Sequence, residues 1–395
     1  METREGFNLF NIIILGLVSL LTDISTEMVY PLLPLFLTAQ LGASPAIVGL
    51  IEGIAESLAS LLKVFSGYFS DLWQRRKPLA IAGYGSSTIG KVFLFLATSW
   101  GWVLTGRIID RFGKGIRTAP RDALIADSAD PAQRGRAYGL HRTMDTLGAA
   151  AGVLLAYLFL QSAPGNYRAI FLYSLLPAAL GVGLLFLVRE KAPIRSKGTG
   201  KKLSLQWSAL DRRLQAFLLV VFLFTLGNSS NQFLLLRAKN LGFSAAQVLL
   251  LYLFYNLTYA LVSYPAGHLS DRIGRKTLLV LGYLFYGVVY FGFALANAGS
   301  TLWFLFGLYG LYIGFTEGVE KALVADIAPG HLRATVIGLH ATLVGIGLLP
   351  ASLLAGILWD VFGPRAPFYF GGLLGVLAAF GLYLVVPGYG QTKKA

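Results

Sequence analysis

Five cationic side chains and three carboxylates share one otherwise apolar stretch, residues 101–127, which reads GWVLTGRIIDRFGKGIRTAPRDALIAD. As a helix, this stretch gathers its cations within about 120° of arc, with Asp110 among them and Asp122 at their edge. The cations are Arg107, Arg111, Lys114, Arg117 and Arg121. Opposite charges on one helix face can form ion pairs, hold an anion, or change a neighbouring acid's proton occupancy. The stretch therefore predicts a functional polar surface, called here the basic stripe.

Carboxylates elsewhere in the first half are spaced to face such a stripe. Asp23 and Glu27 lie four residues apart, hence on one helix face, and Tyr30-Pro31 follows them. Pro31 and Pro34 interrupt helical hydrogen bonding and permit a bend. Lys114 and two further sets could serve the proton or the substrate: Glu52, Glu56 and Lys63, and Arg142 and Asp145. An acid that approaches an arginine favours its ionised form, so helix movement could release and take up a proton. Static salt bridges within the first half are the alternative.

The elements that must position these residues are membrane helices. The 395 residues are 55% hydrophobic and only 13% charged, with a mean hydropathy of +0.65, whereas soluble domains are about 25% charged. Apolar runs of about 20 residues, the length that spans a bilayer, recur along the whole chain. Cysteine is absent, which excludes disulfides and thiolate metal sites. The first apolar stretch is too long for a cleaved signal peptide.

The pattern predicts an all-α membrane protein with twelve transmembrane helices. Their expected ranges are 9–40, 45–70, 78–99, 102–126, 136–161, 167–188, 214–239, 245–269, 277–297, 300–325, 334–359 and 366–387. A longer basic stretch divides them, so the expected organisation is a six-helix bundle at 1–188, a cytoplasmic linker at 189–213 and a second bundle at 214–395.

Lysine and arginine placement predicts the orientation. With the N-terminus inside, most cations fall in cytoplasmic segments, and only four fall outside: Arg168, Arg237, Lys239 and Arg365. Both termini are therefore expected in the cytoplasm, and the net charge of +14 faces lipid rather than nucleic acid. Within the basic stripe, Arg117 and Arg121 lie near the cytoplasmic end, where snorkelling or lipid phosphate would satisfy them. Arg107, Arg111 and Lys114 lie deeper and are expected to be paired or functional.

The chain also repeats itself. At an offset of 200 residues, Gly67-Tyr-Phe-Ser-Asp71 falls on Gly267-His-Leu-Ser-Asp271, and at an offset of 199, Ala123-Leu-Ile-Ala-Asp127 falls on Ala322-Leu-Val-Ala-Asp326. His141 falls on His340 at the same offset, and a structural hydrogen-bonding role is favoured for both. Two halves of the same direction form a parallel repeat. The charges of the first half are not repeated, since Leu223 and Gly227 match Asp23 and Glu27.

The loop from Gly267 through Asp271, Arg272 and Gly274 to Arg275 and Lys276 resembles the signature of the major facilitator superfamily. The resemblance covers nearly the whole chain and implies a twelve-helix transporter in two parallel six-helix repeats. It also implies a cytoplasmic gating latch in each half, formed by Gly67, Asp71 and Arg75 and by Gly267, Asp271, Arg272 and Arg275. The first copy departs from the signature, with Leu72 in place of arginine and Gln74 in place of glycine.

Leu104-x-x-Arg107 is similar to the fourth-helix motif of proton-coupled drug exporters in that family, although Asp110-Arg111 stands where they carry Gln-Gly. The resemblance implies that the first, fourth, seventh and tenth helices line a central cavity, so the basic stripe would face the first helix. Proton coupling is therefore assigned to Asp23, Glu27, Arg107, Asp110 and Arg111.

The second half carries the expected substrate side. Residues 227–232, GNSSNQ, interrupt the seventh helix, a discontinuity typical of binding sites. With Tyr30 of the first half, the candidates are Asn228, Asn231, Gln232, Tyr252, Tyr255, Asn256, Glu317 and Glu320. Such a wall of aromatic and amide groups suits an amphipathic organic solute. Ordinary contacts between helices are the alternative.

These observations favour a proton-coupled transporter that works by alternating access, more readily an exporter than an importer. An importer that binds an organic anion at the basic stripe is the alternative, and a membrane enzyme acting on lipid is a remote one. No ATP-binding G-x-x-x-x-G-K-[ST] pattern occurs, so no cofactor is expected beyond the proton gradient. The expected partners are a small solute, protons and lipid, without nucleic acid. The expected location is a bacterial inner membrane, with the protein active as a monomer.

Overall fold

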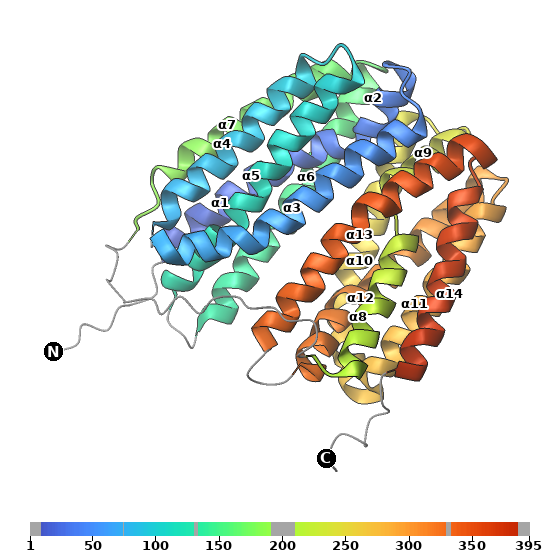
Figure 1. Ribbon diagram of the computed structural model, residues 1–395. Helices are drawn as coiled ribbons and strands as arrows, with labels where there is room; N and C mark the ends of the chain where they lie inside the picture. Colours follow the sequence, from blue (N-terminus) through green and yellow to red (C-terminus); the bar gives the residue numbers. More distant parts are fainter. Residues whose placement is uncertain (1–8, 74, 130–132, 191–209, 329–332, 386–395) are drawn as a thin grey trace. The chain divides into compact units, whose positions relative to one another are not determined.

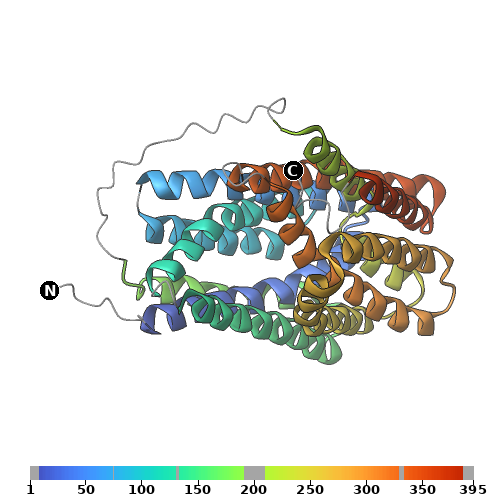
Figure 2. The same cartoon turned by 90° about the horizontal axis from the view of Figure 1, so that it is seen from below.

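The computed structural model describes residues 9–73, 75–129, 133–190, 210–328 and 333–385, and regular structure within these ranges is helical throughout (Figure 1, Figure 2). The first half contains α1 (Leu9–Val29), the 3₁₀ turn η1 (Tyr30–Leu32), α2 (Leu33–Ala39), α3 (Pro45–Trp73), α4 (Arg76–Phe95), α5 (Trp100–Asp127), α6 (Arg134–Ser162) and α7 (Tyr167–Leu185). The second contains α8 (Arg212–Gly227), α9 (Gln232–Asn240), α10 (Ala245–Ile273), α11 (Arg275–Leu295), α12 (Gly299–Ile327), α13 (Arg333–Phe362) and α14 (Ala366–Val385). Each half begins with an interrupted helix, followed by five continuous ones.

The twelve predicted spans are confirmed, because α1 to α2 forms one interrupted span and α8 to α9 another. Within the described residues, ten of the twelve are long and apolar enough to cross a membrane by composition alone. The two exceptions are α4, which holds Lys91 beside a run of small and hydroxyl residues, and α5, which holds the basic stripe. Helices of this polarity are stable in a bilayer where protein covers their polar faces.

The chain divides into two compact units, residues 1–41 with 58–200 and residues 42–57 with 201–395. The first part of α3 therefore belongs to the second unit, where it packs on α13. A Cβ added at Gly49 would lie 2.1 Å from the carbonyl oxygen of Ser352, and one at Gly53 would lie 2.9 Å from that of Leu349. The boundaries predicted from the sequence do not anticipate this exchange, and most of the predicted linker, residues 191–209, lies outside the described residues.

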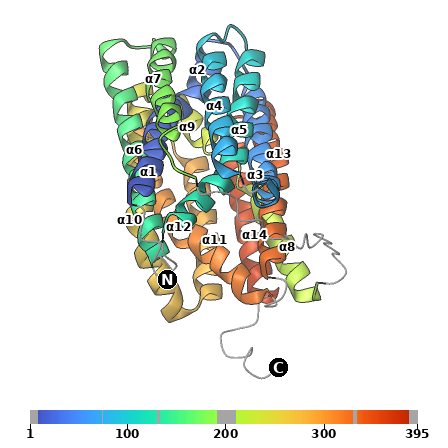
Figure 3. The same ribbon diagram turned by 90° about the vertical axis from the view of Figure 1, so that its left-hand side faces the viewer.

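Glycines set the distance between the two polar helices of the first unit, α4 and α5, which lie side by side (Figure 3). A Cβ at Gly113 of α5 would lie 2.3 Å from the carbonyl oxygen of Gly83, and one at Gly90 of α4 would lie 2.6 Å from that of Gly106. The seven-residue spacing on both helices repeats this close approach after two turns. Small residues at such contacts allow helix backbones to meet closely.

Two more glycines hold the acidic part of α1 against α6. A Cβ at Gly148 would lie 2.4 Å from the carbonyl oxygen of Leu20, and one at Gly152 would lie 2.4 Å from that of Ile24. Because Asp23 lies on the same two turns of α1, this contact fixes its height in the first unit.

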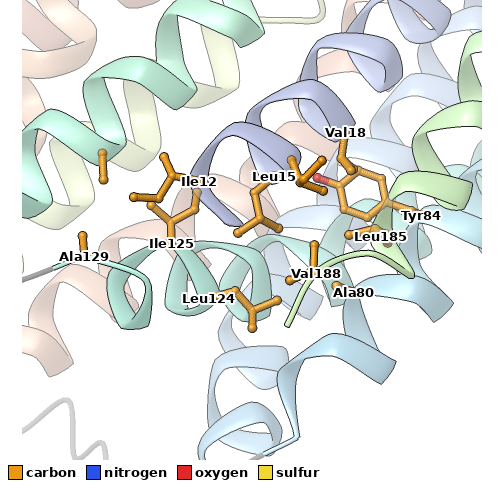
Figure 4. Close-up of a cluster of buried hydrophobic side chains, with 12 residues drawn as sticks. Ile12, Leu15, Val18, Ala80, Tyr84, Leu124, Ile125, Ala129, Leu185 and Val188 are labelled. Atoms are coloured by element: carbon orange, nitrogen blue, oxygen red, sulfur yellow. The ribbon is translucent and has the colours of Figure 1, made fainter. Parts of the chain in front are cut away.

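An apolar cluster closes the first unit on the side of α1 where the chain begins (Figure 4). It joins α1, α4, α5 and α7 through Ile12, Leu15, Val18, Ala80, Tyr84, Leu124, Ile125, Leu185 and Val188. The cluster buries the ring of Tyr84, which is 2% exposed. This apolar cluster therefore lies between the polar residues in the middle of these helices and the helix ends on that side.

Two of the three arginines predicted outside, Arg168 and Arg237, cap helix ends, and the third, Arg365, bonds a side chain. Arg168 donates to the carbonyl oxygen of Ala97 at 2.7 Å, just beyond α4. Arg237, 2% exposed, donates to the carbonyl oxygens of Phe293 and Ala296 at 3.1 and 2.7 Å, at the end of α11. Arg365 donates to the side chain of Asn297. The last carbonyls of a helix lack partners within it, so these bonds stabilise the ends of α4 and α11.

Candidate functional site

The structure divides the basic stripe between two neighbours. The guanidinium carbons of Arg107 and Arg111 lie 5.4 and 5.8 Å from the ring centroid of Tyr30, so these two side chains face the bend after α1, as predicted. Arg117 instead faces α4, where it donates to Ser87 and lies 4.4 Å from the ring centroid of Tyr84. Lys114 is exposed. The stripe therefore forms two buried arginine sites with an exposed lysine between them.

The predicted snorkelling of Arg117 is wrong. Its side chain is 7% exposed and turned into the unit, because the glycine-lined contact of α4 with α5 places Ser87 and the Tyr84 ring within its reach. Arg121 bonds its own neighbour, Asp122, at 2.8 Å and is partly exposed.

Asp110 lies between the two deeper arginines. Its Oδ2 atom is 3.5 Å from Arg107 and 3.7 Å from Arg111, and all three side chains are almost fully buried. The backbone carbonyl of Asp110 accepts a bond from Ser87 at 3.1 Å, which ties this turn of α5 to α4. A carboxylate shared by two guanidiniums compensates part of their charge where water does not reach.

A buried lysine that the sequence analysis missed completes this cluster. Lys91 of α4 is 3% exposed and donates to the hydroxyls of Ser25 and Thr26 on α1, at 2.7 and 3.1 Å. The carboxylates of Asp110 and Asp23 interact electrostatically with its ammonium group at longer range. The sequence could have indicated this residue, since a lysine in the middle of a membrane span is costly. The predicted span at 78–99 was nevertheless assigned no functional residue.

The acids of α1 face several charged groups at once. Asp23 interacts electrostatically with Asp145 of α6 and Glu27 on its own helix, and with Arg117 and Lys114 of α5. Both Asp23 and Glu27 are half-buried. The structure thus brings the predicted proton-coupling acids, the basic stripe and Asp145 together in one unit.

The remaining candidate residues of the first half differ in burial and in their partners. Asp145 pairs with His141 on its own helix, Nδ1 to Oδ2 at 3.6 Å, while Arg142 is exposed. On α3, Glu52 is buried and Glu56 half-buried in the part that packs with the second unit, and Lys63 is exposed further along. These three residues of α3 thus lie in very different surroundings.

In the second unit, the predicted break of the seventh span is confirmed between α8 and α9. Asn231 donates to the hydroxyl of Tyr255 at 3.2 Å and accepts from that of Tyr309 at 2.6 Å. Asn228 donates to the hydroxyl of Tyr312 at 3.4 Å, and Gln232 is fully buried. The break therefore holds its amides on a wall of tyrosines.

Most of that wall was missed by the sequence analysis. Tyr283, Tyr286 and Tyr290 of α11 and Tyr309 and Tyr312 of α12 are at most 4% exposed. The last four pack ring against ring, and Tyr283 stacks on Phe224 of α8. The hydroxyl of Tyr286 donates to the carbonyl oxygen of Gly227 at 2.8 Å, which satisfies the end of α8 at the break. The three tyrosines of α11 lie three and four residues apart, a spacing that identifies one helix face.

The other predicted substrate residues lie around this wall. Tyr252 is buried with its ring 5.2 Å from that of Tyr255, and Asn256 donates to the carbonyl oxygen of Tyr252. Glu317 accepts from Tyr259 at 2.7 Å and from Lys321 at 2.8 Å. Glu320 is bonded to Tyr283 and His340. Over the described residues, no group of three or more histidine and acidic side chains is arranged to hold a metal.

The residues of the predicted latch in the second half include an ion-pair network within one unit. Arg275 lies 2.6 Å from Asp326 and 3.5 Å from Asp271, and it donates to the carbonyl oxygen of Ala322 at 3.2 Å. Gly274 joins α10 to α11 with φ of 92°, a conformation that favours glycine. Arg272 is exposed and Gly267 half-buried.

In the first half, Arg76 rather than Arg75 takes the place of Arg275. Arg76 pairs with Asp127 and donates to the carbonyl oxygen of Ala123, which match Asp326 and Ala322 at the offset of 199. The change of offset from 200 to 199 thus falls within the loop itself. The predicted latch residue Arg75 is exposed, and the surroundings of Gly67 and Asp71 lie outside what the structure describes.

Comparison with known proteins decides the family. The chain matches the model of the Major Facilitator Superfamily twice, over residues 15–236 and 216–395. The chain belongs to the major facilitator superfamily. An uncharacterized MFS-type transporter of Methanocaldococcus jannaschii is 37% identical over 382 residues, which cover 95% of this chain and 94% of that protein. The protein is therefore a multi-pass membrane transporter of the twelve-helix fold, and not an enzyme.

Two further proteins are similar to this chain over a shorter stretch or at lower sequence identity. The quinolone resistance protein NorA of Staphylococcus aureus is 30% identical over 140 residues, which cover 35% of this chain and 36% of that protein. The crystal structure of the nucleoside transporter NupG superposes with a TM-score of 0.81 at 13% identity, over 96% of this chain and 100% of that one. At this identity, the structural likeness shows the fold alone.

Proposed function

We propose that the protein is a proton-coupled antiporter that exports a small organic solute. The observation that carries this proposal is the position of Asp23. It interacts electrostatically with two carboxylates, Asp145 and Glu27, and with two cations, Arg117 and Lys114, on three helices of one unit. Nearby carboxylates favour the protonated form of an acid, and nearby cations favour the ionised form. Small movements among α1, α5 and α6 therefore change the proton occupancy of Asp23.

The buried cluster beside it provides the mechanical link. Lys91 bonds Ser25 and Thr26 on the same two turns of α1 that carry Asp23 and Glu27. The turn of α5 that holds Arg107, Asp110 and Arg111 is bonded to α4 through Ser87. When the solute moves α1 relative to α4 and α5, the distance from the acids to the basic stripe changes. Approach releases the proton and separation permits its uptake.

The second half supplies the solute site in this proposal. The amides of Asn228 and Asn231 and the hydroxyls of Tyr255, Tyr309 and Tyr312 offer both hydrogen-bond donors and acceptors beside apolar rings. Glu317 is exposed and adds a carboxylate that attracts a cationic group. Such a site suits an amphipathic solute with an aromatic or cationic part. The partial similarity to the quinolone resistance protein NorA supports export of that class.

The proposal also includes the energy source of transport and the membrane in which the protein acts. The proton gradient is the energy source, without a cofactor or a nucleotide, and the protein acts as a monomer in a bacterial inner membrane. Import of an organic anion is the second candidate. It is favoured by the burial of four cations, Lys91, Arg107, Arg111 and Arg117, in one unit.

Transport in proteoliposomes separates these candidates. The purified protein is reconstituted with the pH dye pyranine inside, and a fluorescent quinolone or an aromatic carboxylate is added outside. Antiport predicts that the quinolone accumulates when the interior is acid and that its entry makes the interior more alkaline. Accumulation of the carboxylate alone, with acidification of the interior, would instead establish the importer. Accumulation that ignores the imposed pH gradient contradicts proton coupling in either direction.

A further inference from the structure

Three side chains of the second unit meet in a hydrogen-bonded row. The hydroxyl of Tyr283 on α11 donates to Oε2 of Glu320 on α12 at 2.7 Å. The other carboxylate oxygen, Oε1, lies 2.8 Å from Nε2 of His340 on α13. Both oxygens of Glu320 are thus engaged by groups of the protein itself. This leaves Glu320 poorly suited to the substrate contact expected from the sequence.

The row is held rigidly. Tyr283 is fully buried, and its ring stacks on Phe224 of α8 with centroids 3.8 Å apart and planes 2° from parallel. This packing fixes the direction of the hydroxyl. The side chains of Glu320 and His340 are 17% and 10% exposed. Dissolved salt therefore screens their electrostatic interaction only weakly.

The first unit carries the same three positions with a different centre. At the offset of 199 residues, Tyr84, Arg121 and His141 match Tyr283, Glu320 and His340. Arg121 bonds Asp122 instead, and His141 pairs with Asp145 on its own helix. Both halves fold alike with opposite charges at the central position, so packing does not require a carboxylate at Glu320. The carboxylate of Glu320, between a tyrosine and a histidine, is therefore better explained by its chemistry than by packing.

Carboxylate and imidazole at this separation can hold one proton between them. In the neutral imidazole, Nε2–H donates to Glu320, and a proton added at Nδ1 gives an imidazolium that keeps the same bond. The carboxylate stabilises that cation, and the Tyr283 hydroxyl stabilises the carboxylate. We propose that Tyr283, Glu320 and His340 form a proton-binding site in the second half of the protein, separate from the acids of α1.

Other charged and titratable groups lie around this site. Glu317, one turn before Glu320 on α12, accepts from Tyr259 of α10 and from Lys321, the residue after Glu320. Tyr312 on α12 interacts electrostatically with Glu320. The α8 side chain that packs on the row, Phe224, does not titrate, and Lys276 of α11 is bonded to the end of α14.

The site is independent of the proposed direction of transport, because it concerns proton binding alone. The three residues lie seven to eight positions from the ends of α11, α12 and α13 that carry the basic loops. A proton there changes the charge of the second half near those ends. The protein would then titrate in both halves, at Asp23 and Glu27 and at His340 with Glu320.

Histidine resonances test the proposal directly. The full chain is labelled with ¹⁵N-histidine and placed in nanodiscs, and its four histidines are followed between about pH 5 and pH 9. The signal lost in His340→Gln identifies His340. We expect His340 to titrate in this range, and Glu320→Gln to move its midpoint to lower pH by about one unit or more, because the neutral amide no longer stabilises the imidazolium.

The matched control is Glu317→Gln, which removes a carboxylate of the same helix that bonds Tyr259 rather than His340. It should leave the His340 midpoint within a few tenths of a unit of the parent, since more distant charges act weakly. Tyr283→Phe keeps the ring and should leave His340 titrating. Equal midpoints in the parent and in Glu320→Gln, or a His340 that stays neutral throughout, would overturn the proposal. Because nothing is transported, failure of the proposed antiport cannot produce that result.

Discussion

Replacing Asp110 by asparagine tests the buried charge cluster of the first unit. The substitution keeps the shape of the side chain and removes the negative charge that lies 3.5 Å from Arg107 and 3.7 Å from Arg111. Both guanidiniums are at most 3% exposed, and breaking a buried ion pair by removing one partner costs about 3–5 kcal/mol. One kcal/mol shifts Tm by about 2–4 °C in units of this size. The lower cost therefore predicts a Tm decrease of about 6–12 °C in detergent, measured by tryptophan fluorescence.

Asp122→Asn is the control for this experiment. Asp122 bonds Arg121 at the shorter distance of 2.8 Å, but the two side chains are 41% and 19% exposed. Exposed pairs contribute about 0–1 kcal/mol, so this variant should melt within about 4 °C of the parent. Equal Tm values for the two variants, or an unchanged Tm for Asp110→Asn, would refute the reasoning that burial decides the effect.

Three further predictions concern packing, backbone and topology. Gly90→Ala should lower Tm by several degrees because its Cβ would meet the α5 backbone at 2.6 Å, while Gly85→Ala, which meets nothing within 4 Å, should not; equal effects would contradict the close contact. Gly274→Ala should cost about 1–3 kcal/mol through its φ of 92°, and an unchanged denaturation midpoint would show that the joint is not strained by a side chain. An impermeant thiol reagent should label Ser300→Cys in intact cells but not Ser196→Cys, and the opposite pattern would reverse the assigned orientation.

The fold was largely predictable because bilayer thickness sets helix length. Ten spans are apolar enough to be found from composition alone, and the stripe identified α5 as a helix whose charges protein must cover. The break at residues 227–232 was predictable as well, since five polar side chains in a row do not suit a lipid-facing helix. The division of α3 between the two units was not, because no local pattern marks which neighbour a helix will pack against.

The site was predictable in its residue types and less so in its contacts. Periodicity placed Arg107, Arg111 and Arg117 on one face, but a glycine-lined contact with α4 turned the last of them toward Ser87. Lys91 was missed because it is a single cation, without the regular spacing that marked the basic stripe. The tyrosines of α11 and α12 were missed because aromatic residues at helical spacing are as common in cores as in binding sites.

Gradient-driven transport by neutral variants of the α1 acids tests the central claim most directly. Asp23→Asn and Glu27→Gln are reconstituted in proteoliposomes with the fluorescent quinolone, which is followed under an imposed pH gradient and, separately, as exchange without a gradient. A neutral isostere mimics the protonated acid, so we predict that at least one variant loses gradient-driven accumulation and keeps exchange. If both variants accumulate the quinolone as fully as the parent, the proton does not bind at α1 and the account of coupling is wrong.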